Sequence, residues 1–363
     1  MNQSAIYNAY YHGHHKGFFF WLRNARSIAL PQSLLPAILA VVLCLPPSSI
    51  AMQGVHHPLS TISALLAVLG VAIGHLAMNL ADDYYDYRRD PRIRSTLSSI
   101  SVRARLDKCT YINNGDATPE DLFRAMVVFT LVAGLCGVGC VVAQFILHGV
   151  EAALAVVFYA ALGLIFGLGY SRRPLDLAMR GLGEPTVGLI FGPFLMLGVQ
   201  AACTGSLFSW RVMVLSLAIG LLVTNILFVH SVMETKADEE LGKMTLARKI
   251  NNKSLEVVGV AFFGLVPYIL IAVGVLTRLW SAWYLLSFIT IPMTVYLIVS
   301  LSRFTRGLPT NDNPRWWMGP MPEFHLFQEA KMDWFLIRWL LARNVVMYFC
   351  LIIIIIELCL HLI

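Results

Sequence analysis

Hydrophobic residues along this chain form long blocks that are separated by polar segments. Nine blocks have roughly 18 or more residues, the length that a helix needs to cross the hydrocarbon core of a bilayer. Alternation of polar and apolar residues with a period of two, the pattern of a transmembrane barrel, is absent. The pattern predicts an all-α, polytopic membrane protein with about nine transmembrane helices, at residues 28–46, 60–81, 121–147, 152–169, 184–203, 212–233, 255–277, 281–301 and 340–362.

The composition strengthens this prediction. Of the 363 residues, 58% are hydrophobic and only 13% are charged, whereas a soluble domain has about 25% charged residues. The mean hydropathy is +0.69. These values exclude an ordinary soluble domain as the main body of the chain.

The positions of the positive charges predict an orientation. All of the 27 Lys and Arg residues except Arg211 and Arg278 fall in alternate connecting segments, beginning with the N-terminal one. Because cytoplasmic segments carry the excess of Lys and Arg, we expect the N-terminus and these segments in the cytoplasm, and the C-terminus outside. The net charge of +6 then suits anionic lipids or an anionic substrate, and gives no reason to expect nucleic acid.

The pattern also divides the chain into four parts. Residues 1–27 would be a cytoplasmic N-terminal segment, and residues 28–301 an eight-helix bundle that holds the active site. Residues 302–339 would be a cytoplasmic or interfacial loop before a ninth helix at 340–363. Within that loop, residues 323–339 mix Phe, Leu and Trp with charges, which fits an interfacial helix or an irregular ordered loop.

Carboxylates are concentrated where the second predicted helix reaches the cytoplasmic side. A helical spacing of 100° per residue places five polar side chains of this stretch within one arc of about 100°. Carboxylates on one face repel each other, and a Mg²⁺ ion, which prefers oxygen ligands, would relieve that repulsion. This polar face consists of Asn79, Asp82, Asp83, Asp86 and Asp90.

A second acidic pair, Glu234 and Asp238, lies at the matching end of the sixth predicted helix. Two acidic helix ends with metal ions between them could hold a diphosphate, and nearby basic residues could neutralise it as it leaves. A solvated acidic rim is the plainer alternative, and many of the basic residues serve topology. The candidate basic residues are Arg92, Arg94, Arg103, Lys108, Arg172, Arg173, Lys236 and Lys243.

Three stretches resemble motifs of the UbiA superfamily of intramembrane prenyltransferases. Residues 79–90, NLADDYYDYRRD, resemble its first aspartate-rich motif. Residues 234–247, ETKADEELGKMTLA, resemble the second motif of the menaquinone branch. Residues 170–184, YSRRPLDLAMRGLGE, followed by Phe191-Gly192-Pro193, are similar to a signature of the 1,4-dihydroxy-2-naphthoate polyprenyltransferases.

The resemblance implies nine helices around a lipid-open chamber capped by cytoplasmic loops. It implies Mg²⁺-dependent transfer of a prenyl chain from a polyprenyl diphosphate to an aromatic acceptor, 1,4-dihydroxy-2-naphthoate in menaquinone biosynthesis. Two Mg²⁺ ions would be held by Asp83, Asp86, Asp90, Glu234 and Asp238, with Asp82 and Asn79 in support. Catalysis would fall to Asp83, Asp86, Asp90 and Asp238, with Asp83 as a candidate base. Phosphate contacts would come from Lys108, Arg172, Arg173 and Lys243, and acceptor contacts from Tyr170, Arg180 and Glu184.

Several positions depart from the branch pattern. Asp82 stands where Asn is usual, Met179 replaces a Tyr, and Glu234 replaces an Asp; His230 and Ser231 stand where the branch has paired Asn. Two alternatives therefore stay open. One is the same superfamily with another acceptor, such as 4-hydroxybenzoate, another quinone head group or a lipid alcohol. The other is a cation-coupled transporter, whose acids would lie near the bilayer midplane.

Overall fold

A computed structural model describes residues 17–45, 58–89, 109–113, 115–240, 242–322, 324–329 and 331–362. Within these ranges the chain is helical, with one isolated bridge between Arg180 and Met244 and no strand, so the predicted all-α class is confirmed. The longer helices are α3 (Pro31–Leu43), α5 (Pro58–Arg89), α8 (Pro119–His148), α9 (Val150–Ser171), α11 (Leu195–Thr204), α12 (Trp210–Met233), α15 (Lys253–Leu276), α16 (Ile291–Thr305) and α18 (Asp333–Leu362). The short helical segments are α2 (Phe18–Asn24), η1 (Ser27–Ala29), α7 (Thr110–Asn113), η3 (Leu177–Met179), α10 (Gly183–Leu189), η4 (Ile190–Phe194), α13 (Thr235–Glu240), α14 (Leu246–Ile250), η5 (Ala282–Thr290), η6 (Trp316–Met318) and α17 (Phe324–Glu329).

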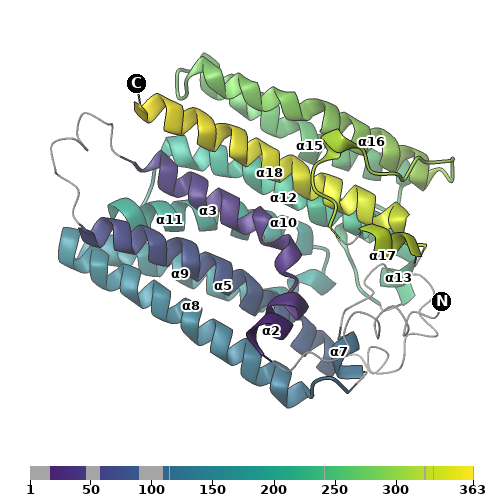
Figure 1. Ribbon diagram of the computed structural model, residues 1–363, viewed down its shortest axis with the longest axis horizontal. Helices are drawn as coiled ribbons and strands as arrows, with labels where there is room; N and C mark the ends of the chain where they lie inside the picture. The colour runs from purple at the N-terminus through teal and green to yellow at the C-terminus, as the bar shows by residue number, and fades with distance from the viewer. Residues whose placement is uncertain are drawn as a thin grey trace.

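The long helices lie alongside one another as a bundle (Figure 1). Helices α5, α8 and α9 pack on one side, and α15 and α16 pack on the other. Between them, α12 contacts α15 and α18, while α18 also packs along α3. The short helices α7, α13 and α17 gather at one end of the bundle, opposite the end where α18 finishes (Figure 1).

Eight helical spans of the described chain are long and apolar enough to cross a membrane. Two of them are composite: α10, η4 and α11 together form the span Gly183–Thr204, and η5 and α16 form the span Ala282–Thr305. Several large apolar side chains on their outer surfaces are exposed, including Leu65 at 66%, Leu135 at 68% and Ile269 at 59%. Such a surface is costly in water and suited to lipid. The first predicted span differs, because α3 has only 13 residues, about 20 Å of helix at 1.5 Å per residue.

Two helices extend beyond their predicted blocks. Helix α5 continues from residue 81 to Arg89, so the acidic stretch is a direct continuation of the membrane helix. Helix α18 begins at Asp333 rather than at residue 340. The part of the chain from 323 to 339 therefore contains the short helix α17 and the first turns of α18, in place of one interfacial helix or an irregular loop.

Buried polar groups of α18 hold the segment between α16 and α18 in place. The Arg338 side chain is 1% exposed, and its Nη2 atom lies 3.0 Å from Oδ1 of Asp312. Arg343 donates to the carbonyl oxygens of Ile28 and Pro320 at 3.0 and 2.9 Å, and the Asn344 amide donates to that of Met318 at 2.7 Å. These contacts join α18 to η1, just before α3, and to the segment that precedes α17.

Glycines bring α10 and η4 close to α12. A Cβ atom added at Gly192 would lie 2.5 Å from the Ser216 carbonyl oxygen and 2.7 Å from Gly220 Cα. Both neighbours are backbone atoms, so the two helices would have to separate to admit a methyl group. Small residues commonly permit this kind of close approach between membrane helices.

The Gly192→Ala variant should therefore be destabilised by about 1–3 kcal/mol, the usual cost of forcing extra volume into a packed interior. Thermal unfolding in detergent would measure the effect. Gly163→Ala is the matched control, because no atom lies within 4 Å of a Cβ added there and alanine is the better helix former. An unchanged melting temperature in Gly192→Ala would contradict the close packing of these helices.

Candidate active site

A cavity of about 220 Å³ lies inside the bundle, between α3, α5, α10, α12 and the start of α18. Its walls are mostly apolar and include Met78, Phe191, Leu336 and Trp339. Phe327 of α17 also lines it, so the segment before α18 forms part of the wall. We call this cavity the chamber. The polar side chains on its wall are Arg26, Gln32, His75, Asn79, Asp82, Tyr170 and His230.

The acidic end of α5 borders the chamber through Asp82. Its carboxylate accepts a hydrogen bond of 2.7 Å from the Ser171 hydroxyl and lies 3.5 Å from Nη1 of Arg26. Asp86, one turn further along, lies 3.7 Å from Nη1 of Arg89. Asp90 lies outside the described residues.

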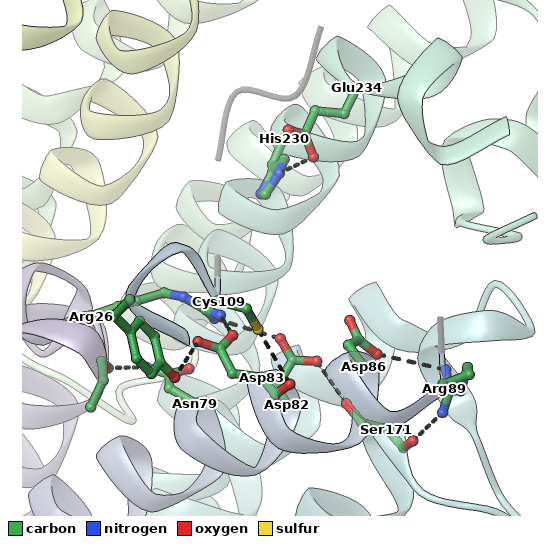
Figure 2. Close-up of polar contacts among 12 residues, drawn as sticks. Arg26, Asn79, Asp82, Asp83, Asp86, Arg89, Cys109, Ser171, His230 and Glu234 are labelled. Carbon is green, nitrogen blue, oxygen red and sulfur yellow. Dashed lines mark hydrogen bonds and ion pairs between the residues drawn. The ribbon is translucent and has the colours of Figure 1, made fainter. Parts of the chain in front are cut away.

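Asp83 is buried beside the chamber rather than on its wall. Its side chain is 1% exposed, and it forms an ion pair with the Arg26 guanidinium (Figure 2). The Tyr111 hydroxyl donates to the other carboxylate oxygen at 3.3 Å. Burial and the nearby Asp83 charge raise the pKa of Tyr111 well above its usual value, so this phenol stays protonated and remains a donor.

The end of α12 carries the second acidic group. His230 lines the chamber, and its Nε2 atom lies 2.5 Å from Oε2 of Glu234. Asp238 follows one turn later in α13 and is 5% exposed. Figure 2 shows the His230–Glu234 pair on one side of the view and the α5 carboxylates on the other. Asp82 and His230 line the same chamber, so the second acidic group reaches it through the contact between Glu234 and His230.

The predicted phosphate-binding residues lie outside the chamber wall. Arg172 and Arg173 are exposed, and the Arg172 guanidinium lies 6.0 Å from the centre of the Tyr85 ring. Lys243 is half-buried, and Lys108 lies outside the described residues. Among the described residues that line the chamber, the single Lys or Arg is Arg26.

The residues predicted for the acceptor side separate in the structure. Tyr170 lines the chamber. Arg180 is exposed and donates to the Pro174 carbonyl oxygen at 3.0 Å. Glu184 is 2% exposed and accepts from the backbone N–H of Leu246 at 3.0 Å, which ties α10 to the start of α14. Asn79 lines the chamber and donates to the Ala25 carbonyl oxygen at 2.8 Å.

Sequence patterns did not single out Arg26, Ser171, His75 or Gln32. Arg26 looked like one of many topology-setting charges, although it pairs with Asp82 and Asp83. Ser171 follows Tyr170 in the motif at residues 170–184, so that motif is a signal that could have identified it. Nothing in the sequence places His75 or Gln32 in a chamber.

The donor set fits a hard cation, because the two helix ends supply carboxylate oxygens, which are the ligands that Mg²⁺ prefers. Within the described part of the chain, no three His, Cys, Asp or Glu side chains converge in a group that could hold a metal ion. Asp82, Asp86 and Glu234 instead contact Ser171, Arg89 and His230. An ion bound between the helix ends would replace some of these contacts.

Residues 38–319 match the sequence model of the UbiA prenyltransferase family, which is well over half of the chain. The chain belongs to the UbiA prenyltransferase family. This UbiA-family protein is therefore an enzyme that transfers prenyl groups. With eight apolar spans in its described part, it is also an integral membrane protein. The family resemblance of the three sequence motifs is confirmed.

Two curated relatives share parts of the chain. The 1,4-dihydroxy-2-naphthoate octaprenyltransferase of Escherichia coli (strain K12) is 23% identical over 230 residues, which is 63% of this chain and 68% of that protein. UbiA prenyltransferase domain-containing protein 1 of Dictyostelium discoideum is 33% identical over 94 residues. That second match spans 26% of this chain and 28% of the relative.

Solved structures share the fold. A UbiA homolog from Archaeoglobus fulgidus bound to DMAPP and Mg²⁺ has a TM-score of 0.52 and 13% identity, covering 90% of this chain and 98% of that one. Digeranylgeranylglyceryl phosphate synthase also has a TM-score of 0.52, with 14% identity over 92% of this chain and 97% of that one. At these identities the likeness establishes the architecture of the UbiA-family protein.

Proposed function

We propose that this protein transfers a prenyl chain from a polyprenyl diphosphate to 1,4-dihydroxy-2-naphthoate, in a Mg²⁺-dependent step of menaquinone biosynthesis. The observation that carries the proposal is one mostly apolar chamber lined by Asp82 of α5 and by His230 of α12. Asp86 follows Asp82 by one turn on α5, and His230 pairs with Glu234 at the end of α12. The similarity to the Escherichia coli octaprenyltransferase supports this acceptor.

The two acidic ends would bind the diphosphate through two Mg²⁺ ions. Asp83 and Asp86 would act from α5 with Asp82 in support, and Glu234 and Asp238 would act from the α12 side. Asp90, which lies outside the described residues, is proposed as a further ligand. Bound magnesium would neutralise charge that develops on the departing diphosphate. Basic groups would add contacts to phosphate oxygens, and we propose Lys108, Arg172, Arg173 and Lys243 for this role.

Transfer would begin when the bond between the allylic carbon and the diphosphate oxygen breaks, with the electron pair leaving on oxygen. The allylic carbon then forms a bond to a ring carbon of the acceptor. The ring regains aromaticity by losing a proton to a base or by losing its carboxylate as carbon dioxide. The apolar chamber wall would keep water from quenching the cation.

The same proposal includes a location. The bundle would span the bacterial inner membrane, with the N-terminus and the active-site loops in the cytoplasm and the C-terminus outside. The distribution of Lys and Arg supports this orientation. The lipid membrane, the polyprenyl diphosphate and the aromatic acceptor are the proposed partners.

Incubation of the purified protein with a labelled prenyl diphosphate and Mg²⁺ would test the proposal. With 1,4-dihydroxy-2-naphthoate as acceptor, we expect a prenylated naphthoquinol product. Chelation of Mg²⁺ should lower the rate about a hundredfold or more, because the metal contributes several kcal/mol of charge stabilisation. Readdition of Mg²⁺ should restore the rate.

Parallel reactions with 4-hydroxybenzoate and a lipid alcohol provide the contrast. Label transferred only to one of these compounds would contradict the menaquinone acceptor while leaving prenyl transfer intact. Cation flux into vesicles without any prenylated product would instead favour a transporter.

A further inference from the structure

Two polar side chains lie in the chamber away from the acidic helix ends. His75 precedes Asp82 by two helical turns on α5, about 10 Å along the helix axis, and is 5% exposed. Gln32 lies at the start of α3 and lines the same chamber. The diphosphate site proposed above uses neither residue.

Contacts with Ser33 indicate which nitrogen of His75 carries the proton. The Ser33 hydroxyl oxygen lies 2.7 Å from His75 Nδ1 and 3.1 Å from the Leu30 carbonyl oxygen. A hydroxyl has one proton, and a carbonyl oxygen can only accept. Both contacts are satisfied together when Ser33 donates to Leu30 and His75 donates its Nδ1 proton to Ser33. In this tautomer, Nε2 carries a lone pair.

The lone pair of Nε2 is available to a ligand. Among the described residues, the polar contact of His75 is the one that Nδ1 makes with Ser33. The Phe191 ring lies 4.7 Å from the imidazole centre at a steep angle, and this contact fixes the ring plane. The imidazole therefore presents a hydrogen-bond acceptor within an apolar cavity.

Gln32 supplies a second and independent observation. Its side-chain oxygen is buried and has no hydrogen-bond donor among the described residues. A buried acceptor without a donor costs about 1–3 kcal/mol, so a ligand that supplies a donor would be favoured there. His75 and Gln32 come from neighbouring helices, because Ser33, which follows Gln32 in α3, is hydrogen-bonded to His75 of α5.

We propose that His75 Nε2 and Gln32 Oε1 bind the aromatic acceptor by receiving hydrogen bonds from its ring hydroxyl groups. Because both protein atoms accept hydrogen bonds, they select a hydroxyl group of the substrate over its carboxylate, whose oxygens have no proton to donate. The contacts hold the ring two turns below the acidic ends, so that a ring carbon points toward the allylic carbon. A hydrogen bond accepted from the phenolic hydroxyl also raises electron density in the ring that attacks. This inference rests on the proposed function.

Acceptors that lack one hydroxyl provide the test. The wild-type protein and the His75→Phe variant would be assayed with 1,4-dihydroxy-2-naphthoate, 1-hydroxy-2-naphthoate and 4-hydroxy-2-naphthoate. In His75→Phe, kcat/KM for the dihydroxy acceptor should fall about tenfold or more, the equivalent of one lost hydrogen bond. The preference for the dihydroxy acceptor over one monohydroxy analogue should shrink by the same factor. The KM for the prenyl diphosphate should not change.

The comparison between acceptors separates binding from general damage. A variant that is merely destabilised loses activity equally with all three acceptors, and this result would overturn the inference. His148→Phe, at the exposed far end of α8, is the matched control and should keep the wild-type preference. His75→Gln retains an acceptor oxygen and should recover part of the preference.

Ser33→Ala supplies a second route if His75→Phe does not fold. Loss of the hydroxyl releases Nδ1, so both tautomers become populated and the preference for the dihydroxy acceptor should fall severalfold. An unchanged preference in Ser33→Ala would refute the assignment. Failure of the proposed function looks different, because the wild-type protein itself would then give no prenylated aromatic product.

Discussion

Prenyl transfer by the Asp86→Asn and Asp238→Asn variants is expected to fall by about a thousandfold or more, with the protein still folded. Each substitution removes one negative charge from the group proposed to hold Mg²⁺ and the diphosphate, and loss of metal-bound charge stabilisation is worth several kcal/mol. Asparagine has nearly the same shape as aspartate, so packing at the helix ends is preserved. Product formation with labelled prenyl diphosphate would measure the effect.

Glu151→Gln is the control for these two variants. Glu151 is exposed in the first turn of α9, at the opposite end of that helix from Ser171, which contacts Asp82. The Glu151→Gln substitution removes one negative charge far from the chamber and should leave the rate of prenyl transfer near that of the wild type. Full activity in either Asp86→Asn or Asp238→Asn would refute the proposed diphosphate site.

Arg26→Gln is expected to destabilise the protein by about 3–5 kcal/mol in Mg²⁺-free buffer, the cost of leaving a buried carboxylate without its charged partner. The partner is Asp83, which is 1% exposed and held between Arg26 and Tyr111. Thermal unfolding in detergent with a chelator present would measure the loss. Arg124→Gln, an exposed substitution on α8, should change stability by about 0.5 kcal/mol at most.

A second substitution tests the cause of that loss. Asp83→Asn in the Arg26→Gln background removes the buried charge that Arg26 no longer balances and should restore much of the stability. If Asp83→Asn brings no recovery, the ion pair is not what stabilises this region. Stabilisation of Arg26→Gln by Mg²⁺ would show that the metal can take the place of Arg26 beside Asp83, which would favour the ligand role over the purely structural one.

Hydropathy identified the helices of this protein but misplaced some of their ends. Apolar blocks end where charges begin, yet α5 continues through Asp82 and Asp86 to Arg89. Likewise α18 starts seven residues before its predicted block. Its first turns can be buried because Arg338 pairs with Asp312 and Arg343 donates to backbone carbonyl oxygens. Such pairings join distant segments, and a hydropathy window cannot detect them.

The candidate site was predictable to a similar extent. Helical spacing placed Asn79 and Asp82 on one face, and both line the chamber. The same spacing could not show that Asp83 would turn to Arg26, because that contact spans 57 residues of sequence. The hydrogen bond between Ser33 and His75 spans 42 residues. Both are set by how helices pack, which local periodicity does not encode.

Contacts between α18 and η1 bring segments from before and after the family match to the same chamber. The family match covers residues 38–319, yet Arg26 and Gln32 lie before it on the chamber wall, and Phe335 and Trp339 lie after it. The matched region contains both acidic helix ends but only part of the enclosure. Flanking segments that the family comparison does not cover therefore supply part of the wall that would keep water from the proposed allylic cation.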